Sequence, residues 1–142
     1  MQTFLPSEAF DESARALDRQ RLGKQRIEAR TILTILANDG PKKGWYFHPA
    51  VRMWRGHEAW LASYGREICT EWRSRGYQDA QLEYFQEAMR RFPWSPYPSW
   101  LGDERFHLSH RSNLLRKKPE HYRVLWPNDP DDLPYIWPEG LL

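Results

Sequence analysis

A basic stretch with helical periodicity, residues 17–30, constrains the fold more than any other feature of this sequence. Successive residues of an α-helix are rotated by about 100°, which brings Leu22, Ala29 and Leu33 onto one apolar face. Cationic residues form stripes on both sides of this face, around one internal carboxylate, Glu28. The pattern predicts an amphipathic helix with these cations at its surface: Arg19, Arg21, Lys24, Arg26 and Arg30.

Helical patterns continue through most of the chain, and no stretch of the sequence shows the alternation typical of a strand. The first helical segment is predicted to begin at residues 7–10, with Asp11 or Ser13 as its N-cap, and to end at the breakers of residues 38–41. Gly23 lies inside this segment, where it marks a bend or the close approach of another element.

A second long helix is predicted to start after His48 and Pro49, because proline is tolerated in the first turn, and to stop at Gly76. The chain after it is rich in proline and aromatic residues over one stretch, which predicts a loop between two further helices. The remaining predictions are a loop at 42–44, a helix at 78–92, a loop at 94–102, a helix at 105–118 and irregular chain after Pro119.

These patterns predict an all-α protein: a single compact helical domain over residues 1–142, with a long first helix, a second long helix and an irregular C-terminal tail. The tail, residues 127–142, contains four acidic and no cationic side chains. The preceding residues carry 21 cationic and 15 acidic side chains, a net charge of +6, although the whole chain has only +2. Such a charge is expected of a domain with one nucleic-acid face.

The single cysteine, Cys69, excludes an internal disulfide and a multi-cysteine zinc site. The sequence has no apolar run long enough to span a membrane and no signal-peptide pattern near its start. We therefore expect a monomeric cytoplasmic protein, associated with the nucleoid, that uses no metal and no cofactor.

The excess of cations over anions in residues 17–30 favours an anionic partner such as phosphate. The alternative is a solvated basic face in which Glu28 is only the i,i+4 partner of Lys24. A second basic segment is interpreted as a hydrogen-bonding surface for phosphate oxygens or a displaced base. The candidate DNA-binding residues there are His107, His110, Arg111, Arg116, Lys117, Lys118, Tyr122 and Arg123.

The histidines and aromatic residues have structural alternatives. His107 and His110 have an i,i+3 spacing that two metal ligands can use, but no cysteine or carboxylate joins them at a suitable interval. His48 and His57 are expected to cap helices or to satisfy buried polar groups. Most of the eight tryptophans are expected in the core, because helices this polar need large side chains to bury enough area. The exceptions, which could stack on bases, are Trp45, Tyr46, Phe47 and Tyr122.

Common catalytic motifs are missing from the sequence, which has no glycine-rich phosphate loop, no nucleophile elbow and no paired-carboxylate motif. A different set of residues is present in three blocks. The first contains Leu17, Gln20, Leu22 and Glu28; the second contains Glu67, Glu71, Arg75, Gly76 and Tyr77; the third contains Pro119, Tyr122 and Arg123.

These blocks resemble the pyrimidine-dimer DNA glycosylase/endonuclease V family, and the start MQTFLP and the segment LGKQR resemble a bacterial branch of it. In the resemblance, Glu28 falls at the position of the catalytic glutamate. The N-terminal loop is longer here than in the phage enzyme of the family. The C-terminal aromatic cluster is thinner, with His121, Val124 and Leu125.

The resemblance implies a chemistry in which the α-amine of the first residue attacks C1′ of the sugar, expels the base and forms a Schiff base that allows β-elimination. An α-amine suits this role because its ordinary pKa of about 7.7–8.0 leaves a substantial neutral fraction near pH 7.5, unlike a lysine. Aligning Phe4 and Leu5 with the family's apolar pair places Met1, rather than Thr3, at the nucleophile position. Gln2 is bulky, so it should hinder removal of Met1.

The resemblance therefore implies a DNA glycosylase with abasic-site lyase activity that excises a damaged or modified pyrimidine from double-stranded DNA. Met1 would be the nucleophile and Glu28 the acid/base group. Two other functions are compatible with the residues alone. One is a non-catalytic nucleic-acid-binding module with the same fold, and the other is a helical domain that binds a protein partner.

Overall fold

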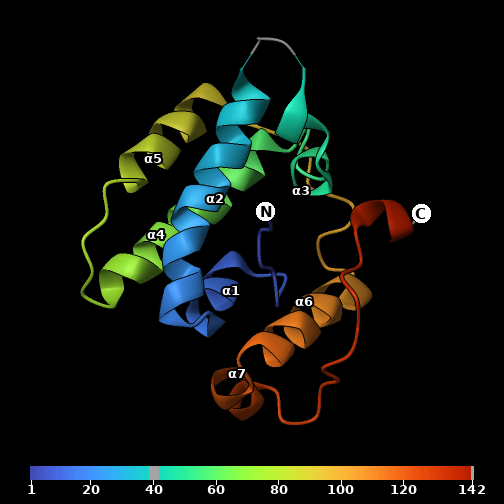
Figure 1. Cartoon of the computed structure of the whole chain (residues 1–142). Coiled ribbons are helices and arrows are strands. Elements are labelled where there is room, and N and C mark those ends of the chain that lie inside the picture. Colours follow the sequence, from blue (N-terminus) through green and yellow to red (C-terminus); the bar gives the residue numbers. More distant parts are fainter. Residues whose placement is uncertain (39–41, 142) are drawn as a thin grey trace.

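Helix α2 (Arg19–Ala37) is the longest helix of the computed structural model, which describes residues 1–38 and 42–141 (Figure 1). Its apolar face is buried as predicted, with Leu22, Ala29 and Leu33 inaccessible to solvent. This face packs against α4 (Glu58–Ser74), which crosses behind it. The described residues form helices and loops and contain no strand, which confirms the all-α prediction.

The first helical segment is two helices rather than one. Helix α1 (Phe10–Ala16) ends at Ala16, with Leu17 as its C-cap, and α2 begins after Asp18, so the prediction of one continuous helix was wrong. The predicted N-caps were also wrong, because the N-cap of α1 is Ala9. Ser13 lies inside the helix, where its hydroxyl donates to the carbonyl of Ser7 and accepts from the amide of the same residue.

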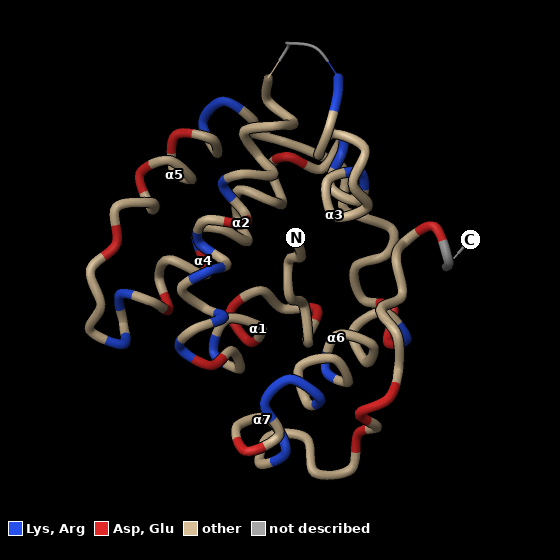
Figure 2. The backbone as a smooth tube through the Cα atoms, viewed as in Figure 1, with Lys and Arg blue, Asp and Glu red and all other residues tan. Residues whose placement is uncertain are grey.

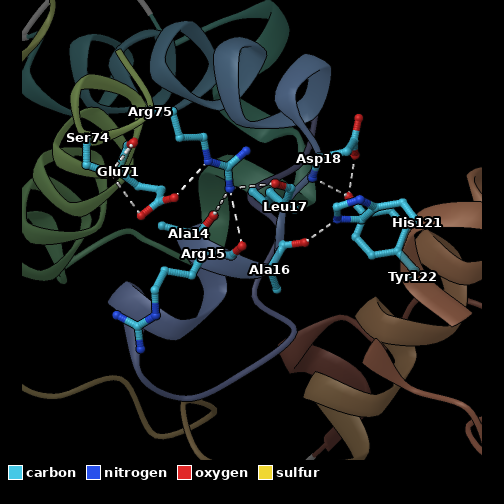
Figure 3. A network of polar contacts seen from close by, with 10 residues as sticks. All are labelled: Ala14, Arg15, Ala16, Leu17, Asp18, Glu71, Ser74, Arg75, His121 and Tyr122. Carbon is cyan, nitrogen blue, oxygen red and sulfur yellow. Dashed lines mark hydrogen bonds and ion pairs between the residues drawn. The ribbon is translucent and has the colours of Figure 1, made fainter. Parts of the chain in front are cut away.

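The side chain of Arg75 binds the backbone at the break between α1 and α2 (Figure 3). The guanidinium of Arg75 donates to the carbonyls of Ala14 (3.3 Å), Arg15 (3.2 Å) and Leu17 (2.8 Å). These carbonyls belong to the last turn of α1 and to its C-cap, Leu17, where helices leave carbonyls without a full set of partners. Glu71 accepts from Nε of Arg75 at 2.7 Å and fixes the direction of the side chain. The Arg75 side chain thereby connects the C-terminal end of α4 to the break between α1 and α2.

Gly23 marks a close approach, not a helix bend. Helix α2 continues through it, and a Cβ atom at this position would lie 3.0 Å from the Trp72 ring of α4. At its other end α2 stops at Ala37, with Asn38 as the C-cap. This end agrees with the predicted breakers, of which residues 39–41 lie outside the described part of the chain.

The second long helix is also divided. After η1 (Gly44–Phe47), helix α3 (Pro49–Arg52) forms only one turn, and α4 starts at Glu58. Gly56, whose φ angle is +84°, turns the chain between them in a conformation that favours glycine. His48 caps α3 as predicted, because its Nδ1 accepts from the amide of Ala50 at 3.0 Å.

The remaining helices are α5 (Leu82–Arg91), α6 (Glu104–Lys117), α7 (Pro119–Leu125) and η2 (Pro138–Leu141). Helix α5 starts later than predicted because Asp79 accepts from the amides of Gln81 and Leu82, forming a capping turn. Helix α6 lies within one residue of its prediction. The prediction of irregular chain directly after Pro119 was wrong.

Helix α7 forms because its aromatic residue docks on the α1–α2 break (Figure 3). Tyr122 is inaccessible to solvent, its hydroxyl donates to the Asp18 carboxylate, and the Asp18 amide donates to that hydroxyl at 3.0 Å. His121 Nε2 lies 2.9 Å from the carbonyl of Ala16. The prediction that Tyr122 stacks on bases was therefore wrong.

The tryptophans are distributed as predicted only in part. Trp54 and Trp100 are buried in the core, together with the rings of Phe85 and Phe106. Trp45 is 57% exposed, in line with its prediction as an exception, but Trp94 is 77% exposed and was not singled out. None of the helices in the described residues is long and apolar enough to cross a membrane.

Candidate active site

A cavity of about 400 Å³ lies where the N-terminus meets α2, the start of α3, the end of α6 and the C-terminal segment. Figure 1 shows the N-terminus near the centre of the molecule, between α2 and α6. The cavity lining includes polar side chains, most of them from α2, and the neighbouring rings of His48, Tyr135 and Trp137, here called the aromatic wall. The residues that line it are Met1, Gln2, Phe4, Gln20, Arg21, Lys24, Gln25, Glu28, His48, Lys117, Tyr135 and Trp137.

Met1 and Glu28, the two predicted catalytic residues, line this same cavity although 27 positions separate them. The charges of both act on the ring of His48. Burial lowers the pKa of His48, the positive N-terminal amine lowers it further, and the Glu28 carboxylate opposes both effects. The cavity therefore brings an α-amine, a carboxylate and an imidazole together.

The buried side chain of Gln25 holds the N-terminal segment in place. Its Nε2 donates to the carbonyl of Gln2 at 2.9 Å, and its Oε1 accepts from the amide of Phe4 at 3.0 Å. The hydroxyl of Tyr64 donates to the same Oε1 at 2.7 Å. The side-chain amide of Gln25 thus makes the two hydrogen bonds to residues 2 and 4 that a neighbouring β-strand would make, directly beside Met1. The sequence analysis missed this residue, although its i+3 spacing from Leu22 places it beside the apolar face.

His107 and His110 also hold the N-terminal segment. His107 Nδ1 lies 2.7 Å from the carbonyl of Leu5 and its Nε2 accepts from the amide of Gly102, so the proton is on Nδ1. His110 Nδ1 accepts from the amide of Leu5 at 2.9 Å. Both rings are buried, so the prediction of a DNA-binding surface at these residues was wrong. These bonds occupy both ring nitrogens of His107 and Nδ1 of His110.

We expect acid to destabilise the folded protein, because His107 and His110 are neutral in the fold and become protonated on unfolding. Burial lowers the pKa of both histidines, that of His110 to about 3. The unfolded chain binds a proton at each near pH 6.5 and the folded chain does not, so stability is complete above pH 6.5 and falls as the pH decreases. For His110 the expected loss is about 1.4 kcal/mol per pH unit between these two pKa values. Chemical unfolding measured from pH 7 to pH 4.5 tests it.

His110→Asn is the control for this prediction, because the Asn Oδ1 can accept from the Leu5 amide and does not titrate. We expect a shallower pH dependence in this variant, by about one proton. The lowered pKa values of Asp18 and Asp79 act only below their ordinary value of 3.8, outside the measured range. An identical pH dependence in the variant and the wild type would contradict the prediction.

The cations of α2 are divided between two sides of the helix. Arg21 and Lys24 line the cavity, and Arg21 also pairs with Asp18 at 3.2 Å. The others contact α4, α5 and the chain between them. Arg26 pairs with Asp79 at 2.7 Å and lies over the ring of Trp72. Arg30 donates to Gln81 and lies over the ring of Tyr84. Arg19 lies over the ring of Tyr77. The structure therefore does not bring the two predicted cationic stripes into one site.

Comparison with known protein families matched residues 1–84 to the family described as pyrimidine dimer DNA glycosylase. The match covers more than half of the 142 residues and includes both Met1 and Glu28. The chain belongs to this family. It is thus a member of a family of DNA-repair glycosylases, as its resemblance indicated. Neither the search of curated proteins nor the search of solved structures found a match.

The C-terminal part of this glycosylase-family chain, which lies beyond the family match, contributes less charge to the cavity than predicted. Lys117 lines the cavity. Lys118 is 4.0 Å from Asp18. The three arginines bind the C-terminal segment: Arg111 pairs with Asp129, Arg116 donates to the carbonyl of Asp131, and Arg123 donates to the carbonyl of Asp129. Figure 2 shows acidic positions in the chain that follows α7 and another close to the C-terminus.

The polar face of α6 positions the C-terminal segment. Ser112 accepts from the amide of Leu133 at 3.0 Å, and Asn113 donates to the carbonyl of the same residue at 3.1 Å. Ser109 accepts from the amide of Ile136 at 3.1 Å. These bonds explain how a segment without long helices is ordered, and they bring Tyr135 and Trp137 into the cavity wall. The sequence analysis assigned this polar run to DNA and missed its role.

Proposed function

We propose that this chain is a DNA glycosylase with abasic-site lyase activity, in which the α-amine of Met1 is the nucleophile and Glu28 the acid/base group. The observation that carries the proposal is that these two residues line one cavity together with Arg21, Lys24 and Lys117. Membership of a pyrimidine dimer DNA glycosylase family supports a damaged pyrimidine in DNA as the substrate.

In this mechanism the lone pair of the neutral amine forms a bond to C1′, and the pair of the glycosidic bond leaves with the base. The C1′–O4′ bond then breaks, one proton passes from the nitrogen to O4′ with the help of Glu28, and a protonated Schiff base forms between the nitrogen and C1′. The Glu28 carboxylate removes a proton from C2′, and the electrons of that bond expel the 3′ phosphate by β-elimination. A positioned acid/base group of this kind typically contributes about 10²–10⁴-fold to the rate.

The surroundings of Thr3 favour Met1 over Thr3 as the nucleophile. Thr3 is inaccessible to solvent, its hydroxyl accepts from Nε1 of Trp54 at 3.0 Å, and its amide donates to the Gln2 side chain. An amine at position 3 would have to leave these contacts to reach DNA. Met1 is partly exposed at the cavity.

Binding to DNA should depend on salt through the cavity cations. Lys24 and Lys117 are exposed and reach the cavity from different helices, so both can contact phosphates. Each phosphate contact contributes about −0.9 to the slope of log affinity against log salt. We therefore expect Lys117→Ala to reduce that slope by about 0.9, as measured by fluorescence anisotropy with an abasic duplex at several salt concentrations.

The matched control is Arg90→Ala, which removes an exposed cation that pairs with Glu87 on α5. This variant should keep the slope of the wild type. A slope that does not change in Lys117→Ala, or that changes equally in both variants, would contradict the proposed phosphate contact.

The proposed function is tested by borohydride reduction during reaction with a duplex that contains one abasic site. A Schiff base is expected to be trapped as a covalent protein–DNA adduct. Salt-dependent binding without an adduct would favour the non-catalytic nucleic-acid-binding module. Absence of salt-dependent binding would favour a protein-interaction domain.

A further inference from the structure

The ring of His48 is held in one protonation form by the backbone. Its Nδ1 accepts from the Ala50 amide at 3.0 Å, which requires an unprotonated Nδ1. An unprotonated Nδ1 makes the ring neutral, and burial and the nearby positive N-terminus, which lower the pKa of this histidine, favour the same form. A neutral imidazole with an unprotonated Nδ1 has its proton on Nε2. The second ring nitrogen, Nε2, is therefore a hydrogen-bond donor on a residue that lines the cavity.

This donor belongs to the aromatic wall of the cavity. The ring of His48 meets Trp137 edge to face, with centroids 6.1 Å apart, and Trp137 lies 6.1 Å from Tyr135. The charged side chains that line the cavity are Glu28, Arg21, Lys24 and Lys117. A nucleobase has an apolar face and carbonyl oxygens at its edge, so it matches an aromatic wall with one donor. The anionic sugar-phosphate backbone of DNA matches the cations among these charged side chains.

We propose that the wall formed by His48, Tyr135 and Trp137 binds the damaged pyrimidine, and that His48 Nε2–H donates a hydrogen bond to a carbonyl oxygen of that base. This inference rests on the proposed function and adds the part of the site that recognises the base. The hydrogen bond strengthens as negative charge develops on the departing base. Two of the three residues come from the C-terminal segment, outside the residues that match the family.

Two substitutions of His48 distinguish its proposed role as a hydrogen-bond donor, through Nε2–H, from its role as the cap of α3, through Nδ1. In His48→Asn, the side-chain oxygen can replace Nδ1 as the cap of α3, but no group replaces Nε2–H. In His48→Gln, the longer side chain can place an amide N–H near the position of Nε2, but it loses the cap. His57→Asn is the matched control, because His57 contacts the Pro96 carbonyl and does not line the cavity.

The experiment compares two duplexes under single-turnover conditions, one with a cyclobutane thymine dimer and one with an abasic site that has no base to bind. The readout is the rate of adduct formation on dimer DNA divided by that on abasic DNA. We expect His48→Asn to lower this ratio at least tenfold, His48→Gln to lower it less than threefold and His57→Asn to keep the wild-type value. Thermal unfolding should show the opposite order, with His48→Gln less stable than His48→Asn.

Three other outcomes would each refute a different part of the proposal. A ratio for His48→Asn within twofold of the wild type, or a lower ratio for His48→Gln than for His48→Asn, shows that His48 acts only as a helix cap. A wild type that reacts with abasic DNA but not with dimer DNA refutes the assignment of the wall to the dimer. A wild type that is trapped on neither duplex refutes the proposed function itself, and the inference with it.

Discussion

Glu28→Gln is expected to lower the rate of strand cleavage at an abasic site at least a hundredfold. The amide keeps the shape of the side chain but cannot take a proton from C2′, and loss of a positioned acid/base group typically costs about 10²–10⁴-fold. Affinity for DNA should stay the same or rise, because a negative charge is removed from a cavity that contains Arg21, Lys24 and Lys117. Single-turnover cleavage of an abasic duplex, with anisotropy for binding, measures both quantities.

The control for this variant is Glu87→Gln, which neutralises an exposed carboxylate on α5 that pairs with Arg90. Its cleavage rate should equal that of the wild type. Equal rates in Glu28→Gln and the wild type would show that Glu28 is a structural partner of its neighbours and has no part in proton transfer.

Blocking the α-amine of Met1 should abolish the trapped adduct and leave most of the salt-dependent binding. Gln25, His107 and His110 hold residues 2, 4 and 5 by hydrogen bonds to their backbone, and an added group is attached to Met1, which lines the cavity. One extra residue moves the free amine by up to about 3.5 Å, which is larger than the length of the bond it must form. The comparison needs three proteins: a free Met1, an acetylated Met1 and a chain with one alanine added before Met1.

Peptide mapping of the wild-type adduct should place the DNA on residue 1. An adduct that persists after acetylation would assign the nucleophile to a lysine, first of all Lys24, which lines the same cavity. Loss of binding together with trapping would show instead that the added group disrupts the N-terminal segment, and unfolding measurements on the same three proteins detect that outcome.

Local patterns predicted the helical elements well where short-range chemistry decides them. Leu22, Ala29 and Leu33 repeat at helical spacing, and their burial in α2 follows from that spacing alone. Pro49 after His48 predicted the start of α3 for a similar reason. The helix boundaries that failed depend on distant residues. Arg75 binds the carbonyls at the end of α1, and Tyr122 docks on Asp18 more than a hundred residues away in sequence.

The candidate site also combines residues that the sequence could identify with residues that only distant contacts bring together. Glu28 and Met1 were identified in the sequence through the family resemblance, and Lys24 and Lys117 by charge. Sequence spacing could not show which cations face the cavity, because Arg26 meets Asp79 and Arg111 meets Asp129 only in the folded chain. The same holds for the histidines, since a polar run such as residues 107–113 looks alike whether it binds DNA or the protein's own backbone.

Residue types at short spacing were enough to predict the helical class, the basic character of residues 17–30 and the family. The folded chain was needed to show that Gln25, His107 and His110 hold the N-terminal segment, and that Tyr135 and Trp137 line the cavity. Buried backbone groups must find hydrogen-bond partners. Which side chains supply those partners depends on contacts between segments far apart in the chain.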